Sequence, residues 1–292
     1  MPPAPHAVLS FGHGTGAGSP AYNPVEEPVP KFITIFFCLV PLLSLSALAD
    51  EWSKNYSVGA KPSLYVDTND AAIEVTRGSS NTIAARVTTQ NYKIGEGGLR
   101  ISEHQDGDKV ELTVHIPNQP GFHISWHDRR VRIEVQVPAE TALDLHSADG
   151  HINVDGTTGG ARIDTSDGSI EVRNFSGGIR ARTADGHITV DGVVDEVYLR
   201  SGDGRIEFTA RPGSRMERGW LIHTSDGRVE VTLPSDFAAE LYAHTGDGRI
   251  TLDIPVTVNG AMERSHVRGK INGGGELLEI STGDGSIHVG KL

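Results

Sequence analysis

The dipeptide Asp-Gly recurs seven times in the second half of the chain, at nearly regular intervals. Successive Asp residues are 18, 18, 18, 23, 21 and 37 positions apart. The pairs are Asp149-Gly150, Asp167-Gly168, Asp185-Gly186, Asp203-Gly204, Asp226-Gly227, Asp247-Gly248 and Asp284-Gly285. Self-similarity at such a period is typical of chains whose units stack on one another. The spacing therefore predicts a repeat architecture.

The residues around each Asp-Gly follow one pattern. Positions six and four before the Asp are apolar, position two before is Ser or Thr, and positions three and five after are apolar. In the third copy these are Ile179, Ala181, Thr183, Ile188 and Val190. The alternation indicates two short strands with one buried face each. Its parity changes at Asp-Gly, so the dipeptide is predicted to be a corner. There Gly would supply a positive φ, and Asp would bind the amides of its own turn.

Two strands and two corners per copy predict an all-β fold, a β-solenoid (β-helix) with coils of about 18–23 residues. Equivalent residues would stack at about 4.8 Å, the distance between strands, and build one continuous core. Residues 139–292 form the regular part. Residues 61–138 alternate less regularly, which predicts irregular N-terminal coils in the same domain, with Asp106-Gly107 as a weaker corner.

The first 49 residues have the features of a leader and secretory signal peptide. Lys31 precedes an uncharged run over 32–49 that ends Ser-Ala-Leu-Ala, which predicts cleavage after Ala49 and export. The alternative is an uncleaved membrane anchor. Residues 50–60 are expected to be a short linker. Cys38, the only cysteine, lies in the leader, so the exported chain would have no disulfide and no cysteine-bound metal.

The formal net charge of the chain is −12. Such a charge repels phosphate backbones and anionic lipid surfaces, so nucleic acid is not an expected partner. Nothing in the sequence indicates a cofactor.

From Val137-Pro138 the chain continues as Leu-x-Leu-x-Ser-x-Asp-Gly-x-Ile-x-Val. In this it resembles the bacterial putative-adhesin family of exported β-solenoid domains. The resemblance covers about residues 60–292 and is strongest over 137–252. It implies a single right-handed β-solenoid outside the cytoplasm and carries over no catalytic residues. The long interval between Asp247 and Asp284 departs from the even spacing of the other copies.

One set of outward positions is a candidate binding site. Five and three residues before the Asp, successive copies carry Arg180, Arg182, Tyr198, Arg200, Leu221, His223, Tyr242 and His244. Stacking is predicted to join the two tyrosines and the leucine into one exposed strip flanked by basic groups, and exposed apolar patches often mark contact surfaces. The strip would suit an anionic or neutral glycan, or the sheet edge of a partner. Alternatively, segment 253–277 covers this face, or the residues are ordinary interstrand pairs.

Other constellations favour structural roles. His223, Thr224 and Asp226 offer a base, a hydroxyl and an acid, but His and the next residue point to opposite faces of a strand, so no catalytic site is predicted. The stacked Asp carboxylates would be neutralised by turn amides or, alternatively, by cations between coils. His123 and His127 favour a structured loop over a metal site, because a third ligand is not evident.

A second outward column, two residues after the Asp, contains Arg205, Arg228 and Arg249. Glu207 and Glu230 follow two residues later on the same face. This arrangement favours a charge ladder supporting the sheet over an anion site.

The sequence thus predicts a non-enzymatic, exported, adhesin-like β-solenoid that presents a repetitive binding surface at the cell envelope. Expected partners are an envelope polysaccharide or protein, and a second copy of the chain through the open solenoid end after Val289. The alternatives are a polysaccharide-active β-helix enzyme, lyase or hydrolase, and a scaffold or sensor subunit of an envelope-stress pathway.

Overall fold

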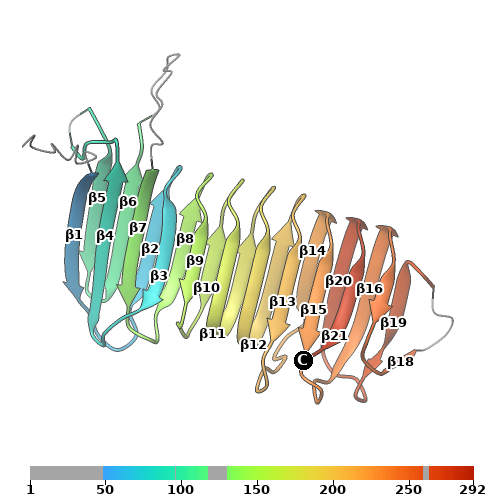
Figure 1. Cartoon of the computed structure of the whole chain (residues 1–292). Helices are drawn as coiled ribbons and strands as arrows, with labels where there is room; N and C mark the ends of the chain where they lie inside the picture. Colours follow the sequence, from blue (N-terminus) through green and yellow to red (C-terminus); the bar gives the residue numbers. More distant parts are fainter. Residues whose placement is uncertain (1–48, 96, 118–129, 259–262) are drawn as a thin grey trace, which may run out of the picture. The chain divides into compact units, whose positions relative to one another are not determined.

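The computed structural model describes residues 49–95, 97–117, 130–258 and 263–292. Over these ranges the protein is all-β, with 21 strands that hydrogen bonds join into one large mixed sheet (Figure 1). The predicted leader before Ala49 lies outside the described residues, as do His123 and His127. The described ranges contain no helix long and apolar enough to cross a membrane.

The strands form two columns, which β11 and β12 join because each runs through both. The first column contains the strands that precede an Asp-Gly corner and those hydrogen-bonded in line with them. In spatial order it is β5 (Arg100–Asp106), β6 (Lys109–His115), β2 (Ser63–Thr68), β8 (Ala142–Ser147), β10 (Ala161–Asp164), the second half of β11 (Ile170–Arg182), the second half of β12 (Ile188–Ser201), β14 (Trp220–Asp226), β20 (Leu277–Asp284), β16 (Ala239–Asp247), β19 (His266–Ile271) and β18 (Val256–Val258).

The second column contains the strands that follow the corners. In spatial order it is β1 (Ala49–Ser57), β4 (Thr82–Gln90), β7 (Arg130–Val137), β3 (Ala72–Arg77), β9 (Ile152–Asp155), the first halves of β11 and β12, β13 (Ile206–Ala210), β15 (Val229–Leu233), β21 (Ile287–Lys291) and β17 (Ile250–Leu252).

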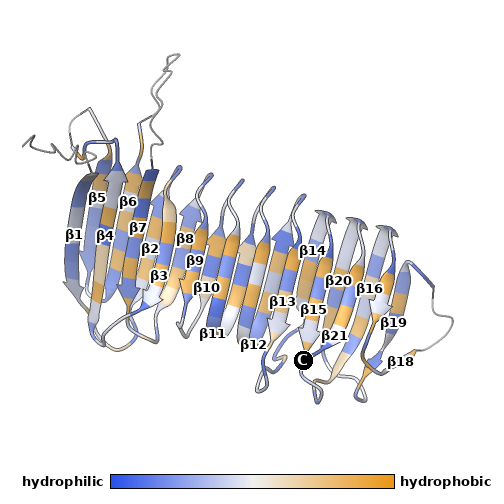
Figure 2. Ribbon diagram, viewed as in Figure 1, coloured by the Kyte–Doolittle hydropathy of each residue, from blue (hydrophilic) through white to orange (hydrophobic). Residues whose placement is uncertain are grey.

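Successive repeats pair in parallel with equivalent residues opposite each other. Ile170 faces Ile152 on one side and Ile188 on the other, and Ile188 in turn faces Ile206. These side chains belong to one buried cluster with Leu199 of the first column. Apolar bands accordingly cross successive strands in Figure 2. Each fully buried Ile or Leu contributes roughly 1.5–3 kcal/mol, so the stacked repeats stabilise one another.

The corner glycines are required by close approach rather than by their φ angles. Five of the seven do not adopt the left-handed region that the sequence analysis expected. A Cβ on Gly186 would instead lie 1.9 Å from the carbonyl oxygen of Gly168 in the preceding repeat, and one on Gly204 would lie 1.8 Å from that of Gly186. The backbones of adjacent repeats therefore meet at the corner with no space for a side chain.

The hydroxyl two residues before the Asp accepts the turn amide at three corners, those of Gly150, Gly186 and Gly204. Gly186 N donates to Thr183 Oγ1 at 3.0 Å, and this hydroxyl donates to the carbonyl oxygen of Gly168 at 3.1 Å. In these corners the hydroxyl, and not the predicted carboxylate, accepts the turn amide. Asp167 and Asp185 are exposed, so their carboxylates lie in water.

The last repeat does not occupy the end of the stack. β20 lies between β14 and β16, and β21 lies between β15 and β17. The repeat around Asp247 is therefore the terminal one, and β19 pairs antiparallel with its strand β16. The predicted open end after Val289 is wrong, because Val289 faces Val231 on one side and Leu252 on the other.

The N-terminal region mixes parallel and antiparallel pairs. β2 and β3 pair in parallel with β8 and β9, as a regular repeat would, whereas β1, β4 and β5 are antiparallel to their neighbours. Asp106-Gly107 is the turn of the β5–β6 hairpin, with a φ of 57° at Gly107, and not a corner between stacked units. The expected linker 50–60 contains most of β1, which pairs with β4.

Candidate functional site

The eight predicted binding residues lie on β11, β12, β14 and β16 of the first column. Their hydrogen-bonded neighbours follow the predicted order only in part. Arg180 faces Tyr198, which faces Leu221, and Arg182 faces Arg200. Beyond Leu221 the order differs, since β20 separates β14 from β16.

Tyr198 is flanked by two guanidinium groups. The Cζ atoms of Arg180 and Arg182 lie 5.0 Å and 5.1 Å from the centroid of its ring. Both distances are within the range of cation–π attraction. Glu196 is the nearest acidic partner of Arg180, at 3.9 Å. The ring and the two cations thus form one unit on the sheet.

Arg200 adds a third positive charge beside this unit. It lies directly opposite Arg182 on the adjacent strand, and like charges in that position repel. Among the described residues neither Arg182 nor Arg200 forms an ion pair, and the Nε atom of Arg182 is buried without a hydrogen-bond partner. Buried polar atoms are normally satisfied, so this donor is an exception. We call Arg180, Arg182, Tyr198 and Arg200 the arginine–tyrosine cluster.

His223 extends the cluster as a neutral group. Burial lowers the pKa of its imidazole below the usual value, and the positive charge of Arg200 lowers it further. Its Nδ1 lies 2.9 Å from Ser281 Oγ. The sequence predicts that His223 is one of the basic groups that flank the strip. At neutral pH the imidazole of His223 is instead an uncharged hydrogen-bonding group.

Tyr242 and His244 lie apart from the arginine–tyrosine cluster. Glu279 occupies the position between Leu221 and Tyr242, and Tyr242 packs against His266 with ring centroids 5.1 Å apart. The predicted apolar strip is therefore interrupted. It is also only half exposed, because outward side chains of adjacent strands cover one another. Within segment 253–277, β18 and β19 extend the sheet beyond β16 and so lie away from the cluster.

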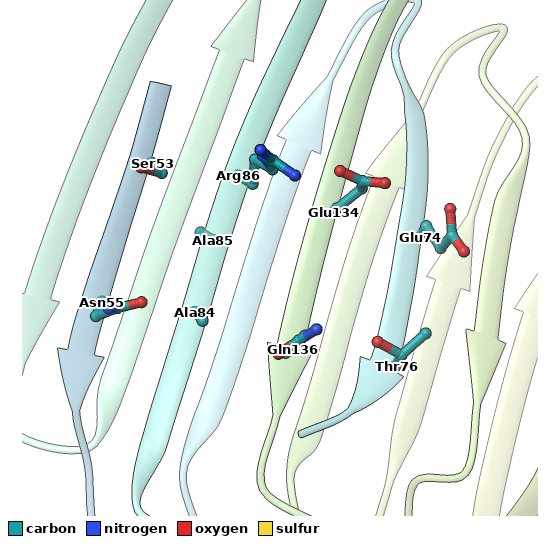
Figure 3. A pocket seen from close by; sticks show the side chains of 9 residues that line it. All are labelled: Ser53, Asn55, Glu74, Thr76, Ala84, Ala85, Arg86, Glu134 and Gln136. Carbon is teal, nitrogen blue, oxygen red and sulfur yellow. The ribbon is translucent and has the colours of Figure 1, made fainter. Parts of the chain in front are cut away.

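A hollow of about 390 Å³ lies on the outward face of the second column, near its N-terminal end (Figure 3). Glu74 and Glu134 lie opposite each other on adjacent strands in its wall. Arg132 Nη1 contacts the Glu74 carboxylate at 3.1 Å. Arg86, which lies opposite Glu134, forms an ion pair with Glu51 at 2.8 Å. Arginines thus accompany the carboxylates of this hollow.

No group of three or more His, Cys, Asp or Glu side chains within the described ranges is placed to hold a metal ion.

No family model and no curated protein matches the chain. Several solved structures are similar to it, and three of them match over 83% of this chain. A putative adhesin from Parabacteroides distasonis is 12% identical, is covered over 98% of its own length and has a TM-score of 0.45. A putative adhesin from Bacteroides fragilis is 10% identical, with 97% covered and a TM-score of 0.42. A putative cell adhesion protein from Clostridium sporogenes is 12% identical, with all of its chain covered and a TM-score of 0.38. These descriptions agree with the family that the sequence resembles.

Proposed function

We propose that the protein is an exported, adhesin-like binding protein, and that its arginine–tyrosine cluster binds an acidic polysaccharide of the cell envelope. The observation that carries the proposal is the approach of two guanidinium groups to the ring of Tyr198, with Arg200 opposite Arg182. Arg182 and Arg200 lie opposite each other and repel, and an anionic ligand would relieve that repulsion.

The chemistry of the cluster suits a sugar acid. Guanidinium groups bind carboxylate or sulfate oxygens with charge-assisted hydrogen bonds. The hydroxyl of Tyr198 can also hydrogen-bond a sugar, next to the two guanidinium groups that lie over its ring. Both elements lie on paired strands, which hold them more rigidly than a loop would.

We further propose that residues 139–292 wind as a right-handed β-solenoid. Parallel, in-register pairing of equivalent residues supports winding, as does the single buried cluster shared by both columns. A repetitive surface of this kind fits a repetitive partner such as a polysaccharide. Export would follow from the leader before Asp50 and can be tested by cell fractionation.

The proposal is tested by affinity electrophoresis in gels that contain polygalacturonate or neutral dextran. The full chain should be retarded by polygalacturonate, and Y198A and R200Q should each abolish most of the retardation. Two matched controls lie on the same outward face. Tyr65 packs against His146 instead of arginines, and Arg162 contacts Asp164 at 3.0 Å. Y65A and R162Q should therefore behave as the unmodified protein. Equal loss in the control variants, or no retardation of the unmodified protein, would refute the proposal.

The opposed pair Glu74 and Glu134 favours one second candidate, a polysaccharide-cleaving enzyme, because such enzymes use two carboxylates across a bond. Release of reducing or unsaturated ends from the same polymers, lost in E134Q, would support this alternative against simple binding.

A further inference from the structure

The insertion of the last repeat changes the outward arginine column of β13, β15, β21 and β17. Backbone hydrogen bonds define the order of this column: Ile206 N donates to Arg228 O, Val229 N to Ser286 O, and Ile287 N to Arg249 O. The small side chain of Ser286 therefore separates two arginines that the repeat pattern alone would place next to each other.

A third arginine follows in the same column. Ile250 N donates to Arg264 O at 3.1 Å, so Arg264 occupies the position that a further repeat would have filled. Arg228, Arg249 and Arg264 line one open hollow of about 550 Å³. Ser286 also lines it and lies between Arg228 and Arg249 in the column. We call these four residues the arginine hollow.

The arginines of the hollow differ from their neighbour in the same column. Arg205 forms an ion pair with Glu207 at 2.8 Å, as a charge ladder requires. Within the described parts of the chain, Arg228, Arg249 and Arg264 have no such partner. The predicted charge ladder therefore forms an ion pair at Arg205, but among the described residues not at Arg228 or Arg249.

One carboxylate also lines the hollow. The Glu230 carboxylate lies 3.7 Å from Nδ1 of His288, which lines the hollow as well. The other ring nitrogen of His288 contacts Asp253 at 2.8 Å. Among the described residues, Glu230 forms no ion pair with Arg228, Arg249 or Arg264.

A backbone donor accompanies them. Gly227 N donates to Asp284 O at 2.9 Å and Gly285 N to Asp247 O at 3.0 Å, each across to the next repeat. Gly248 belongs to the terminal repeat and also lines the hollow. No backbone carbonyl in the described ranges accepts its amide.

We propose that the arginine hollow is a second binding site, specific for a tetrahedral oxyanion, phosphate or sulfate. Several guanidinium groups and a backbone amide around a small open space are the donor set that such anions bind. The anion comes either free or as a substituent of a polysaccharide. The inference is independent of the arginine–tyrosine cluster, which lies on the other column.

The test is isothermal titration calorimetry of the full chain with sodium sulfate and sodium phosphate at constant ionic strength. The unmodified protein should bind one anion saturably. The double variant R249Q/R264Q should bind at least about tenfold more weakly, because each lost charge-assisted contact is worth that order. The matched control R205Q removes an ion-paired arginine of the same column and should change the affinity less than about twofold.

A second titration distinguishes the two sources of the anion. Dextran sulfate binding much more tightly per sulfate than free sulfate identifies a polymer substituent, whereas equal affinity identifies the free anion. The proposal is overturned if the unmodified protein shows no saturable binding of either anion, or if R205Q weakens binding as much as R249Q/R264Q does. Far-UV circular dichroism of each variant establishes that the sheet is retained. Y198A should leave the titrations with free sulfate and free phosphate unchanged.

Discussion

The carbonyl oxygen of Gly168 lies 1.9 Å from the point that a Cβ atom on residue 186 would occupy. Real Cβ atoms do not approach a backbone oxygen so closely, and the oxygen belongs to a hydrogen-bonded stack that cannot easily move. The same relationship recurs at Gly150, Gly204 and Gly248, at 1.8–2.0 Å. Glycine at the corner is thus what allows one repeat to stack on the next.

We expect G186A to destabilise the protein by about 1–3 kcal/mol or more, since the backbones must separate to admit the methyl group. Urea unfolding followed by circular dichroism measures the change in the free energy of unfolding. The control is G160A, because a Cβ at Gly160 meets no atom within 4 Å. A loss of stability as large in G160A as in G186A would contradict the explanation.

We expect T183V to cost about 1–3 kcal/mol of stability, the usual penalty for an unsatisfied buried group. The valine has nearly the same shape as threonine but leaves the amide of Gly186 without its acceptor. Thr189 is an outward threonine of β12, just after the same corner, so T189V serves as the control. If both variants unfold at the same urea concentration as the unmodified protein, the hydroxyl does not stabilise the corner.

The order of the last repeats can be tested by disulfide formation. Leu221 and Glu279 lie opposite each other on adjacent strands, whereas Leu221 and Tyr242 are two strands apart, at about 9–10 Å. In a C38S background, L221C/E279C should cross-link on mild oxidation and L221C/Y242C should not, because disulfides need Cα atoms within about 7 Å. The opposite result would place the repeats in the order of the sequence.

The imidazole of His223 should report the charge of Arg200. Its pKa is below the usual value because of burial and that charge, so R200Q should raise it. A group whose pKa is lower in the folded state binds a proton more readily when unfolded. Stability therefore rises with pH between the folded pKa and about 6.5, the unfolded value.

R200Q should weaken this pH dependence. NMR titration of the His223 ring measures the pKa directly, and R205Q, on the other column, is the control. An unchanged His223 pKa in R200Q would mean that the two side chains do not interact.

The sequence alone predicts the stacking of repeats, since Ile170, Ile188 and Ile206 follow a parity that only stacked units can bury together. It does not predict which repeat lies beside which. Trp220, Leu241 and Leu278 stand at the same point of the pattern, and any of them can pack on another. The predicted strip assumes that repeats adjacent in the sequence are also adjacent in the sheet. It therefore places Leu221 beside Tyr242, whereas in the structure Glu279 separates them.

The corners show a second limit. The hydroxyl two residues before each Asp was visible in every repeat, but the turn amide was assigned to the Asp because carboxylates commonly accept such bonds. In the structure the amide of Gly186 donates a hydrogen bond to Oγ1 of Thr183. The sequence does not predict the arginine hollow either. In sequence order Arg205, Arg228 and Arg249 follow one another in this column, whereas in the structure Ser286 lies between Arg228 and Arg249.

The interior position of β20 and β21 has a consequence for biosynthesis. Domains generally begin to fold from the N-terminus while the ribosome is still adding residues. Here β16 and β17 are made before β20 and β21, yet they reach the rest of the sheet only through them. β16 to β19 must therefore wait until Leu277–Lys291 have been made. Deletion of Leu277–Lys291 would detach β16 to β19 from the rest of the sheet, and not merely remove an edge.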